Sequence, residues 1–545
     1  MAFLAAFPTQ AKRTDDGSKL LQQFVEARLA EVGGQSEAAL SIYQDSLKQE
    51  PDNILVAGKT YVRAIESGNW PLALKAVRSI ELGGSLEKEM PALLFGEAFR
   101  TRNWRSAETA LEELVELGNF AFLEPILRNW IYVAKGSNSD ISFETLEKDR
   151  TASYYFNEQR ILLLLASGEN TGALRALRDV IEQNNVRMSP IRMIAARHFL
   201  ANDQEDIAKG ILVAQGTAGE RRLLEMIESG RGQQAQQRVT GKIGAAFSFH
   251  RLSTDLSTQR AEFLALVMAQ IASSIVGKND FDQLVLGRAY SASNNGEKAR
   301  NIYKKIGMTS PYYIIARNAE IRSFISDDRF SDALQRIEMQ ISDQPKLPEL
   351  HILKGQVFQS KGDLKSAAKA FEYAVFLAEK ANYSEPTLAS YYLTLGSAQE
   401  QSGLWPAGLR SLERANELLP NSANILNYLG YAQLERRENT AAAMLAIRQA
   451  HKLRSSSAAI TDSLGWAYFI IGEHDKAVSY LEKALAGQPQ DPTINEHLGD
   501  AYWTVGRKFE ARYAWKTAKL FAEEADSKRL LTKIDLGLAP ELVSP

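Results

Sequence analysis

The sequence predicts an all-α protein, a solenoid of antiparallel helix pairs, because a repeat of about 34 residues runs along it and strand patterns are missing. Gly430, Gly465 and Gly499 lie 35 and 34 residues apart in similar sequence surroundings. Four further positions continue this register toward the N-terminus at spacings of 34, 41, 34 and 34 residues: Gly396, Gly355, Ile321 and Gly287. Chance does not explain so many units in register, and each unit therefore predicts one structural repeat.

Each unit is expected to fold as two helices joined by a tight turn. In residues 458–491 the first helix carries Leu464 and Tyr468 on one face. It ends at Gly472, since glycine adopts the left-handed conformation of a helix C-cap without a Cβ clash. The second helix places three residues on one face at spacings of four and three: Ala477, Leu481 and Ala484. Pro489 closes the unit, because the residue before a proline is pushed out of the helical region.

This pattern resembles the tetratricopeptide repeat (TPR), L-G-x2-Y … A-x3-F … P. The turn glycine recurs as Gly34, Gly68, Gly168, Gly362, Gly403, Gly472 and Gly506. The small residue of the second helix recurs as Ala39, Ala73, Ala173, Ala208, Ala299, Ala333, Ala367, Ala477 and Ala511. We expect about twelve repeats, starting near residues 20, 54, 88, 154, 189, 280, 314, 348, 389, 423, 458 and 492. The family's early tryptophan is absent. The resemblance implies a right-handed TPR superhelix of antiparallel helix pairs.

Two stretches fall outside the repeat register. Residues 120–153 have helical patterning but no turn glycine at the expected place, and residues 217–251 carry six Arg or Lys against three acidic residues. The second stretch is either a hinge or basic contact loop, or a degenerate repeat pair with a solvated linker, which we favour. The predicted organisation is an N-terminal extension (1–19), an N-terminal array (20–215), an irregular helical connector (216–279), a C-terminal array (280–525) and a C-terminal helix or tail (526–545).

Composition argues against several classes of function. The chain of 545 residues has a formal net charge of -2, which gives no general attraction to nucleic acid. It has no cysteine, and its six histidines form no i, i+3 or i, i+4 pair and no H-E-x-x-H motif, so no metal site is expected. Phosphate-binding, dinucleotide and nucleophile-elbow motifs are also missing. We therefore expect no catalytic residue, no cofactor and no enzyme activity, and no apolar run is long enough for a transmembrane segment.

The functional surface of a TPR solenoid is the concave groove lined by the first helices. Positions 2, 5, 9 and 12 of each TPR face this groove. In the last three repeats they include amide, acidic and aromatic residues: Asn424, Asn427, Tyr431, Asp462, Trp466, Glu496, Asp500 and Trp503. The carboxylates would favour a basic or amine-bearing segment of a partner, and the tryptophans would supply anchoring area. The alternative is that the aromatic side chains pack between helices.

One known TPR device is missing. The clamp by which chaperone-binding TPRs hold a carboxylate needs Lys, Asn and Arg at defined positions, and here those positions are Leu393, Ser397, Tyr428, Ala459 and Ser463. None of them matches. Recognition of an acidic chaperone C-terminus by this route is not expected.

Residues 420–525 carry a closer resemblance. NYLGYAQLERRENTAAA, AAITDSLGWAYFIIGE and DPTINEHLGDAYWTVGRKFEARYAWKTA resemble a family of long bacterial, chiefly alphaproteobacterial, TPR proteins. A more distant similarity is to an envelope TPR lipoprotein that acts as adaptor for a periplasmic carboxy-terminal processing protease. The resemblance implies an envelope adaptor. The missing lipid-attachment cysteine departs from that lipoprotein and leaves a soluble periplasmic form.

The start of the chain bears on localisation. Met1–Ala11 reads MAFLAAFPTQA, which resembles the back half of a secretory signal peptide without its basic segment. The alternative is a hydrophobic N-terminal extension. We expect a non-catalytic scaffold or adaptor in the bacterial periplasm, with protein or peptide partners and no nucleic acid. The alternative is a cytoplasmic assembly or regulatory protein, and the oligomeric state is not predicted.

Overall fold

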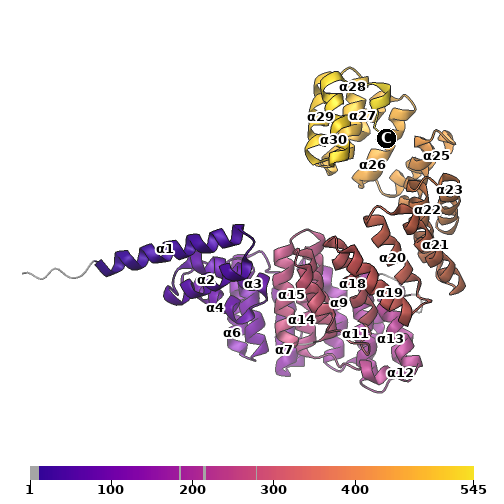
Figure 1. Ribbon diagram of the computed structural model, residues 1–545. Helices are drawn as coiled ribbons and strands as arrows, with labels where there is room; N and C mark the ends of the chain where they lie inside the picture. The colour runs from indigo at the N-terminus through magenta and orange to yellow at the C-terminus, as the bar shows by residue number, and fades with distance from the viewer. Residues whose placement is uncertain (1–10, 183–185, 213–215, 278, 545) are drawn as a thin grey trace, which may run out of the picture. The chain divides into compact units, whose positions relative to one another are not determined.

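The computed structural model describes residues 11–182, 186–212, 216–277 and 279–544. These residues form helices joined by short turns, with no strand among them (Figure 1). They divide into two compact units, residues 1–329 and 330–545. The signal-like stretch of the sequence lies almost wholly outside the described residues.

Both units are built from helices in immediate succession. Unit 1 contains α1 (Ala11–Val32), α2 (Ser36–Gln49), α3 (Ile54–Ser67), α4 (Trp70–Leu82), α5 (Met90–Arg100), α6 (Trp104–Leu117), α7 (Leu123–Lys135), α8 (Phe143–Lys148), α9 (Phe156–Ala166), α10 (Asn170–Glu182), α11 (Ser189–Leu200), α12 (Glu205–Ile211), α13 (Ala218–Glu228), α14 (Gly241–Thr258), α15 (Glu262–Val276), α16 (Asp280–Ala292), α17 (Gly296–Tyr303) and α18 (Tyr313–Ser326). Unit 2 contains α19 (Phe330–Asp343), α20 (Pro348–Ser360), α21 (Leu364–Lys380), α22 (Glu385–Gln401), α23 (Trp405–Leu418), α24 (Ala423–Glu435), α25 (Thr440–Leu453), α26 (Ala458–Ile470), α27 (His474–Gly487), α28 (Pro492–Thr504), α29 (Lys508–Phe521), α30 (Glu524–Leu536) and the 3-10 turn η5 (Pro540–Leu542).

The predicted all-α repeat architecture is confirmed. The nine alanines predicted for the second helices are fully buried, and the seven predicted turn glycines all have a positive φ. Other repeats make the same turn without glycine, at Asp203, Asn294 and Asp328. Each of these residues lies five positions before the buried alanine of the second helix. The glycine pattern alone missed these turns, because Asn and Asp also tolerate the left-handed region.

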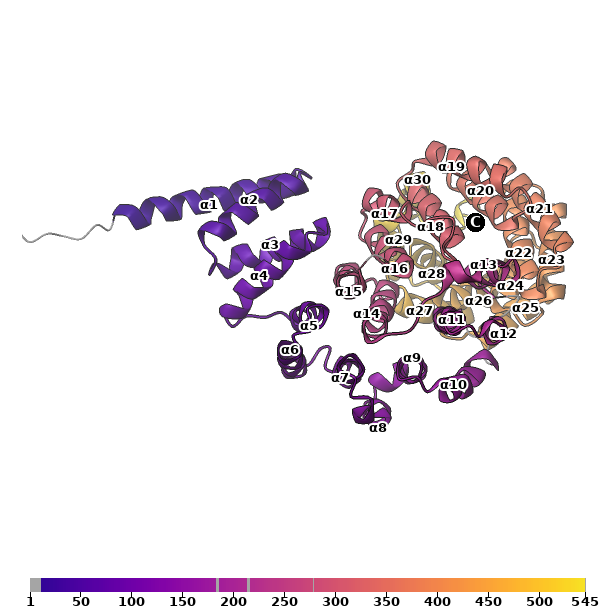
Figure 2. The same ribbon diagram turned by 90° about the horizontal axis from the view of Figure 1, so that it is seen from below.

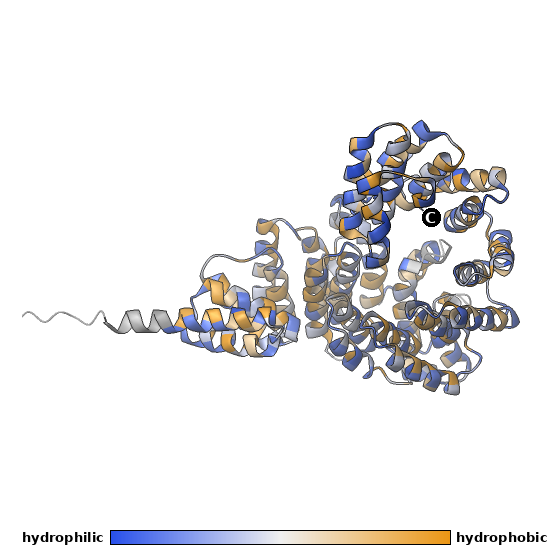
Figure 3. Cartoon of the chain, turned by 45° about the horizontal axis from the view of Figure 1, so that its top comes forward, coloured by the Kyte–Doolittle hydropathy of each residue, from blue (hydrophilic) through white to orange (hydrophobic). Residues whose placement is uncertain are grey.

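Close packing of the two helices of a repeat explains the glycines that set the register. A Cβ at Gly465 in α26 would lie 2.7 Å from Leu481 Cγ in α27. Any larger side chain would push the helices apart. Figure 3 shows hydrophobic and hydrophilic residues alternating along the helices, as expected when one side of each helix packs against its neighbours.

In unit 1 two helices fill the face that the first helices present. The helix α15 packs against α3 and α5, and α14 packs against α7 and α9. Figure 2 shows α14 and α15 on one side of the row of α5, α7 and α9, with α6, α8 and α10 on the other. Residues Ala265–Ala272 of α15 are all buried, as expected for a helix with protein on every side.

This arrangement corrects the interpretation of residues 216–279. They form no irregular connector between two arrays, because α14 and α15 belong to the core of unit 1. At their centre the Trp130 ring of α7 lies under Gly244 of α14, where a Cβ would come within 2.1 Å of the ring. The Trp130 indole Nε1 donates a hydrogen bond of 2.8 Å to Gln159 Oε1.

The basic residues of this stretch are engaged inside unit 1. Most of their side chains donate hydrogen bonds to backbone carbonyls or neighbouring side chains: Arg221 to Gly216, Arg222 to Met308, Arg231 to Ser229 and Arg238 to Ala201. Arg251 Nε lies 3.2 Å from Glu158 Oε1. These contacts account for the basic excess by internal pairing.

In unit 2 the helix pairs follow one another without a helix that turns back. Each pair packs against the next, from α20 and α21 to α28 and α29, and α30 packs against α29. The first helices α24, α26 and α28 therefore form a continuous inner face. This face carries the eight residues that the sequence predicts for partner binding.

Candidate functional site: the inner face of the C-terminal repeats

A histidine–aspartate pair occupies the middle of the inner face. His497 of α28 lies with its Nδ1 3.0 Å from Asp462 Oδ1 of α26, and both side chains are buried. The Trp466 ring stacks on the His497 ring at 4.0 Å between centroids. Burial alone would lower the pKa of His497, but Asp462, Asp500 and Glu496 outweigh it and raise the pKa above its ordinary value.

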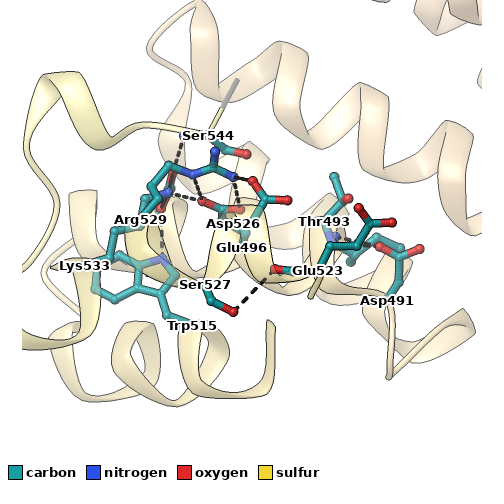
Figure 4. Close-up of polar contacts among 12 residues, drawn as sticks. Asp491, Thr493, Glu496, Trp515, Glu523, Asp526, Ser527, Arg529, Lys533 and Ser544 are labelled. Atoms are coloured by element: carbon teal, nitrogen blue, oxygen red, sulfur yellow. Dashed lines mark hydrogen bonds and ion pairs between the residues drawn. The ribbon is translucent and has the colours of Figure 1, made fainter. Parts of the chain in front are cut away.

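The last repeat holds its carboxylates against two basic side chains of α30. Lys533 Nζ lies 2.6 Å from Glu496 Oε1 and 2.8 Å from Asp500 Oδ2, and Lys533 is fully buried. Arg529 makes two hydrogen bonds of 2.9 Å to Glu496, and Figure 4 shows both α30 side chains directed at this carboxylate. Burial of Glu496 would raise its pKa, but Arg529 and Lys533 lower it below its ordinary value.

The C-terminal tail completes this cluster. The backbone N–H of Ser544 donates a hydrogen bond of 2.9 Å to Asp500 Oδ2, and the Trp515 indole donates one of 2.8 Å to Asp500 Oδ1. Trp503 packs against Trp515, with Gly537 directly over its ring. The inner face of the last repeat is therefore closed by residues of the same chain.

These placements correct the expected surroundings of the predicted site. Four of its members are buried, each with 6% or less of its surface exposed: Asp462, Trp466, Glu496 and Asp500. The basic segment that the carboxylates were expected to attract is present, but it is the chain's own α30. Trp503 is half-buried under the end of α30.

The part of the inner face that stays accessible lies on α24. Asn424 is exposed, while Asn427 and Tyr431 are half-buried. Asn427 donates a hydrogen bond of 3.2 Å to Ser463 Oγ in α26. Burial and the nearby carboxylate of Glu435 raise the pKa of Tyr431 well above its ordinary value, so its hydroxyl keeps its proton.

A pocket of about 620 Å³ opens at the C-terminal end of α24, beyond Tyr431. Its walls come from the ends of α24 and α26 and from the C-terminal tail: Leu434, Glu435, Arg436, Arg437, Trp466, Phe469, Ile470, Pro540, Val543 and Ser544. The floor is apolar and aromatic, and the rim carries charges of both signs. Such a pocket can receive an apolar side chain of a bound segment while polar rim groups contact its backbone.

Sequence reasoning missed the residues that close the face. Lys533 and Arg529 are four residues apart on α30, so they project from one side of that helix. The signal was available in part: Glu496 and Asp500 have the same spacing on α28, and two carboxylates at core positions require a basic partner. The sequence alone did not show which Lys or Arg supplies it.

Comparison with known sequences bears on the repeat family. The profile of the tetratricopeptide repeat matches residues 393–458 and 463–519, the stretch of α22 to α29. Residues 393–519 of the chain therefore carry tetratricopeptide repeats.

Two curated relatives match part of this chain. The TPR repeat-containing protein PA4667 of Pseudomonas aeruginosa is 25% identical over 220 residues, which is 39% of this chain and 35% of the relative. The protein O-mannosyl-transferase TMTC1 of Homo sapiens is 25% identical over 222 residues, 39% of this chain and 24% of the relative. The chain thus spans about a third or less of each relative, and the transferase activity in the second name belongs to that protein.

Three solved structures that match parts or most of this chain are MamA, yeast Tom70 and Cut9. MamA is 28% identical with a TM-score of 0.26 and covers 36% of this chain and 100% of its own. The yeast Tom70 structure is 11% identical, with a TM-score of 0.38, and covers 96% of both chains. Cut9 in the Cut9–Hcn1 complex of the APC/C is 14% identical, with a TM-score of 0.39, and covers 96% of this chain and 98% of its own.

Two searches of the described ranges concern other kinds of site. No group of three or more His, Asp or Glu residues is placed there to hold a metal ion. No helix in those ranges is long and apolar enough to cross a bilayer.

Proposed function

We propose that this TPR protein is a non-catalytic scaffold that binds a segment of a protein partner on the inner face of its C-terminal repeats. The observation that carries the proposal is the pocket of about 620 Å³ at the ends of α24 and α26, together with the accessible Asn424, Asn427 and Tyr431 earlier on α24. Asparagine side chains hold a peptide backbone through paired donor and acceptor groups. The aromatic floor accepts an apolar side chain.

The carboxylates of α28 have a different role in this proposal. Glu496 and Asp500 hold α30 and the tail in place, and the tail residues Pro540 and Val543 form one wall of the pocket. A partner segment therefore binds against the tail or replaces it. The expected ligand is an extended or helical segment with an apolar anchor, and a basic segment binds well only after α30 has left.

Photo-crosslinking tests the binding site. A photoreactive amino acid at Glu435, which lines the pocket, or at Asn424, at the start of the same helix, should form adducts with a partner in the native cell, because a segment bound along α24 would pass both positions. The matched control is Glu413, which is exposed on the second helix α23. Equal adducts from Glu413, or partner adducts only from unit 1, would overturn the assignment.

Substitutions should avoid the buried tryptophan. Trp466 is 1% exposed, so replacing it would damage the fold as well as any binding. Phe469→Ser and Asn427→Ala instead alter the pocket and its approach at half-buried positions. Both should weaken partner recovery while the helical content stays unchanged.

We further propose that the protein works in the bacterial cell envelope, as an adaptor for a protease or a cell-wall enzyme. Support comes from the distant similarity of the NYLGY and DSLGW segments to an envelope TPR lipoprotein. The second candidate is a cytoplasmic assembly or regulatory protein. Protease protection in intact cells and spheroplasts separates them: cleavage in spheroplasts supports the periplasm, and cleavage only after lysis supports the cytoplasm.

A further inference from the structure

The second helix of the last repeat, α29, has apolar residues on two opposite faces. One face is buried in unit 2 and carries Ala511, Trp515 and Ala518. The other carries Phe509, Tyr513 and Leu520, whose side chains are 73%, 59% and 76% exposed. Their spacings of four and seven residues place them in one row about 16 Å long.

The corresponding rows in the preceding repeats are less apolar. The positions 34 residues earlier, in α27, hold Asp475, Ser479 and Ala486. Those of α25 hold Ala441, Leu445 and Lys452, of which Leu445 is an exposed large apolar side chain. The equivalent row of α23 includes Arg410 and Glu417. A terminal repeat ordinarily needs a polar outer face for solubility. With three large exposed apolar side chains, the row of α29 departs from what this position requires.

Lysines surround this row. α29 carries Lys508, Arg512, Lys516 and Lys519 against the single acid Glu510, a net charge of +3 on a chain of net charge -2. Glu510 pairs with Arg507. Within the described part of the chain the three lysines form no ion pair, and Lys516 lies over the Tyr513 ring. Their charges are available to an anionic surface.

A hollow of about 420 Å³ adjoins the row between α29 and α30. Leu520, Leu531 and Ile534 form its apolar lining, and Lys516 and Lys519 border it. A phospholipid matches this order of groups, since its phosphate meets the lysines and the start of its acyl chains meets the leucines. An acidic peptide would satisfy the lysines, but it offers no reason for the protruding phenylalanine and leucine.

We propose that this face, Phe509, Tyr513, Leu520 and the flanking lysines, docks the protein onto an anionic membrane surface. Phe509 and Leu520 enter the boundary between head groups and acyl chains, and Tyr513 lies at head-group level. The lysines attract anionic lipid. Three apolar side chains give reversible peripheral attachment and are too few for a stable protein interface of ordinary size. The face lies on α29 and α30, away from the pocket of the proposed function, and does not depend on it.

Cosedimentation of the full chain with vesicles tests the proposal. The protein should bind phosphatidylcholine vesicles containing about one third phosphatidylglycerol and leave pure phosphatidylcholine vesicles unbound, with weaker binding at high salt. Phe509→Ser with Leu520→Ser, and separately Lys516→Glu with Lys519→Glu, should each lower the partition coefficient about tenfold or more. Phe509, Lys516 and Leu520 are exposed and Lys519 is half-buried, so the variants should fold.

Two matched controls complete the design. Ser479→Ala changes the equivalent outer row of α27, and Val25→Ser with Leu29→Ser changes an exposed apolar row of α1 whose charges are balanced. Both should bind vesicles as the wild type does. The proposal is overturned if the wild type ignores anionic vesicles or if the α29 variants bind them unchanged. Loss of self-association or of a protein complex in those variants, without vesicle binding, would assign the face to a protein instead.

Discussion

The two units close the inner faces of their first helices in different ways. Unit 1 uses two helices, α14 and α15, and the contact is apolar: Trp130 under Gly244, and eight consecutive buried residues in α15. Unit 2 uses one short helix, α30, and a tail, held mainly by Lys533 and Arg529 on two carboxylates.

The difference indicates which face can open. Apolar contact that spans the middle of a unit is part of its core, and removing it exposes surface on every side. A terminal helix touches only the last repeat, so its departure leaves the other repeats packed. We infer that unit 1 keeps its face filled permanently and that unit 2 can expose its face.

The largest expected effect comes from breaking the apolar closure of unit 1. Trp130→Ala should destabilise the protein by about 3 to 5 kcal/mol, because it removes a large buried ring and the shorter of the two hydrogen bonds that Gln159 Oε1 accepts. Urea unfolding followed by circular dichroism measures this loss. Val115→Ala, at an exposed position of α6, is the control. A loss below about 1 kcal/mol would show that α14 does not depend on the contact.

The next effect comes from breaking the polar closure of unit 2. Lys533→Ala leaves Glu496 and Asp500 without their buried cation, and loss of one partner of such a group costs about 3 to 5 kcal/mol. Since α30 can leave, the cost should appear as detachment of α30. Limited proteolysis should then cleave between residues 523 and 537 while the other repeats stay resistant. Lys528→Ala, at an exposed position of the same helix, should remain resistant throughout.

A smaller effect is expected from pH. The folded-state pKa of His497 is raised, so its contribution to stability is complete below the ordinary histidine pKa and is lost as pH rises through the raised value. Unit 2 should therefore lose stability as the pH rises above the ordinary pKa of histidine. Thermal unfolding of wild type and His497→Gln across this range measures it, and the variant should lack the slope. Burial lowers the pKa values of His351 and His451, so these residues act on the acidic side. A wild-type slope retained in His497→Gln would assign the effect to another group.

The smallest effect is expected on the accessible part of the inner face. Asn427→Ala removes one neutral hydrogen bond at a half-buried position and should cost about 0.5 to 1 kcal/mol. Chemical denaturation is precise enough to place this value below that of Lys533→Ala. A cost as large as that of Lys533→Ala would show that α24 is as closed as α28.

Much of the fold could be predicted because each repeat has the same packing requirement at the same positions. The spacing of Gly465 and Ala477 requires two helices in close contact, and the same requirement returns about every 34 residues. The turns at Asp203 and Asn294 were missed because the prediction looked only for glycine, the residue most common at a left-handed helix C-cap. The packing of α14 and α15 was missed because they contact helices much earlier in the chain, α7 and α9 for α14 and α3 and α5 for α15, which no local period records.

The candidate site was predicted only in part for a related reason. Family positions locate the inner face, and the eight predicted residues do lie on its first helices. Their exposure depends on α30 and the tail, which lie outside the repeat. Asp500 illustrates this limit, because its partners Lys533 and Ser544 come from beyond the last repeat.

Hydrogen exchange followed by mass spectrometry tests the central contrast most directly. The amides of α15 (262–276) and α30 (524–536) are compared in the same sample of the full chain. The account predicts that α15 exchanges as slowly as the core helices of unit 1, by global unfolding, and that α30 exchanges faster than α28 by local detachment. Exchange of α30 as slow as that of α28, or rapid local exchange of α15, would contradict it.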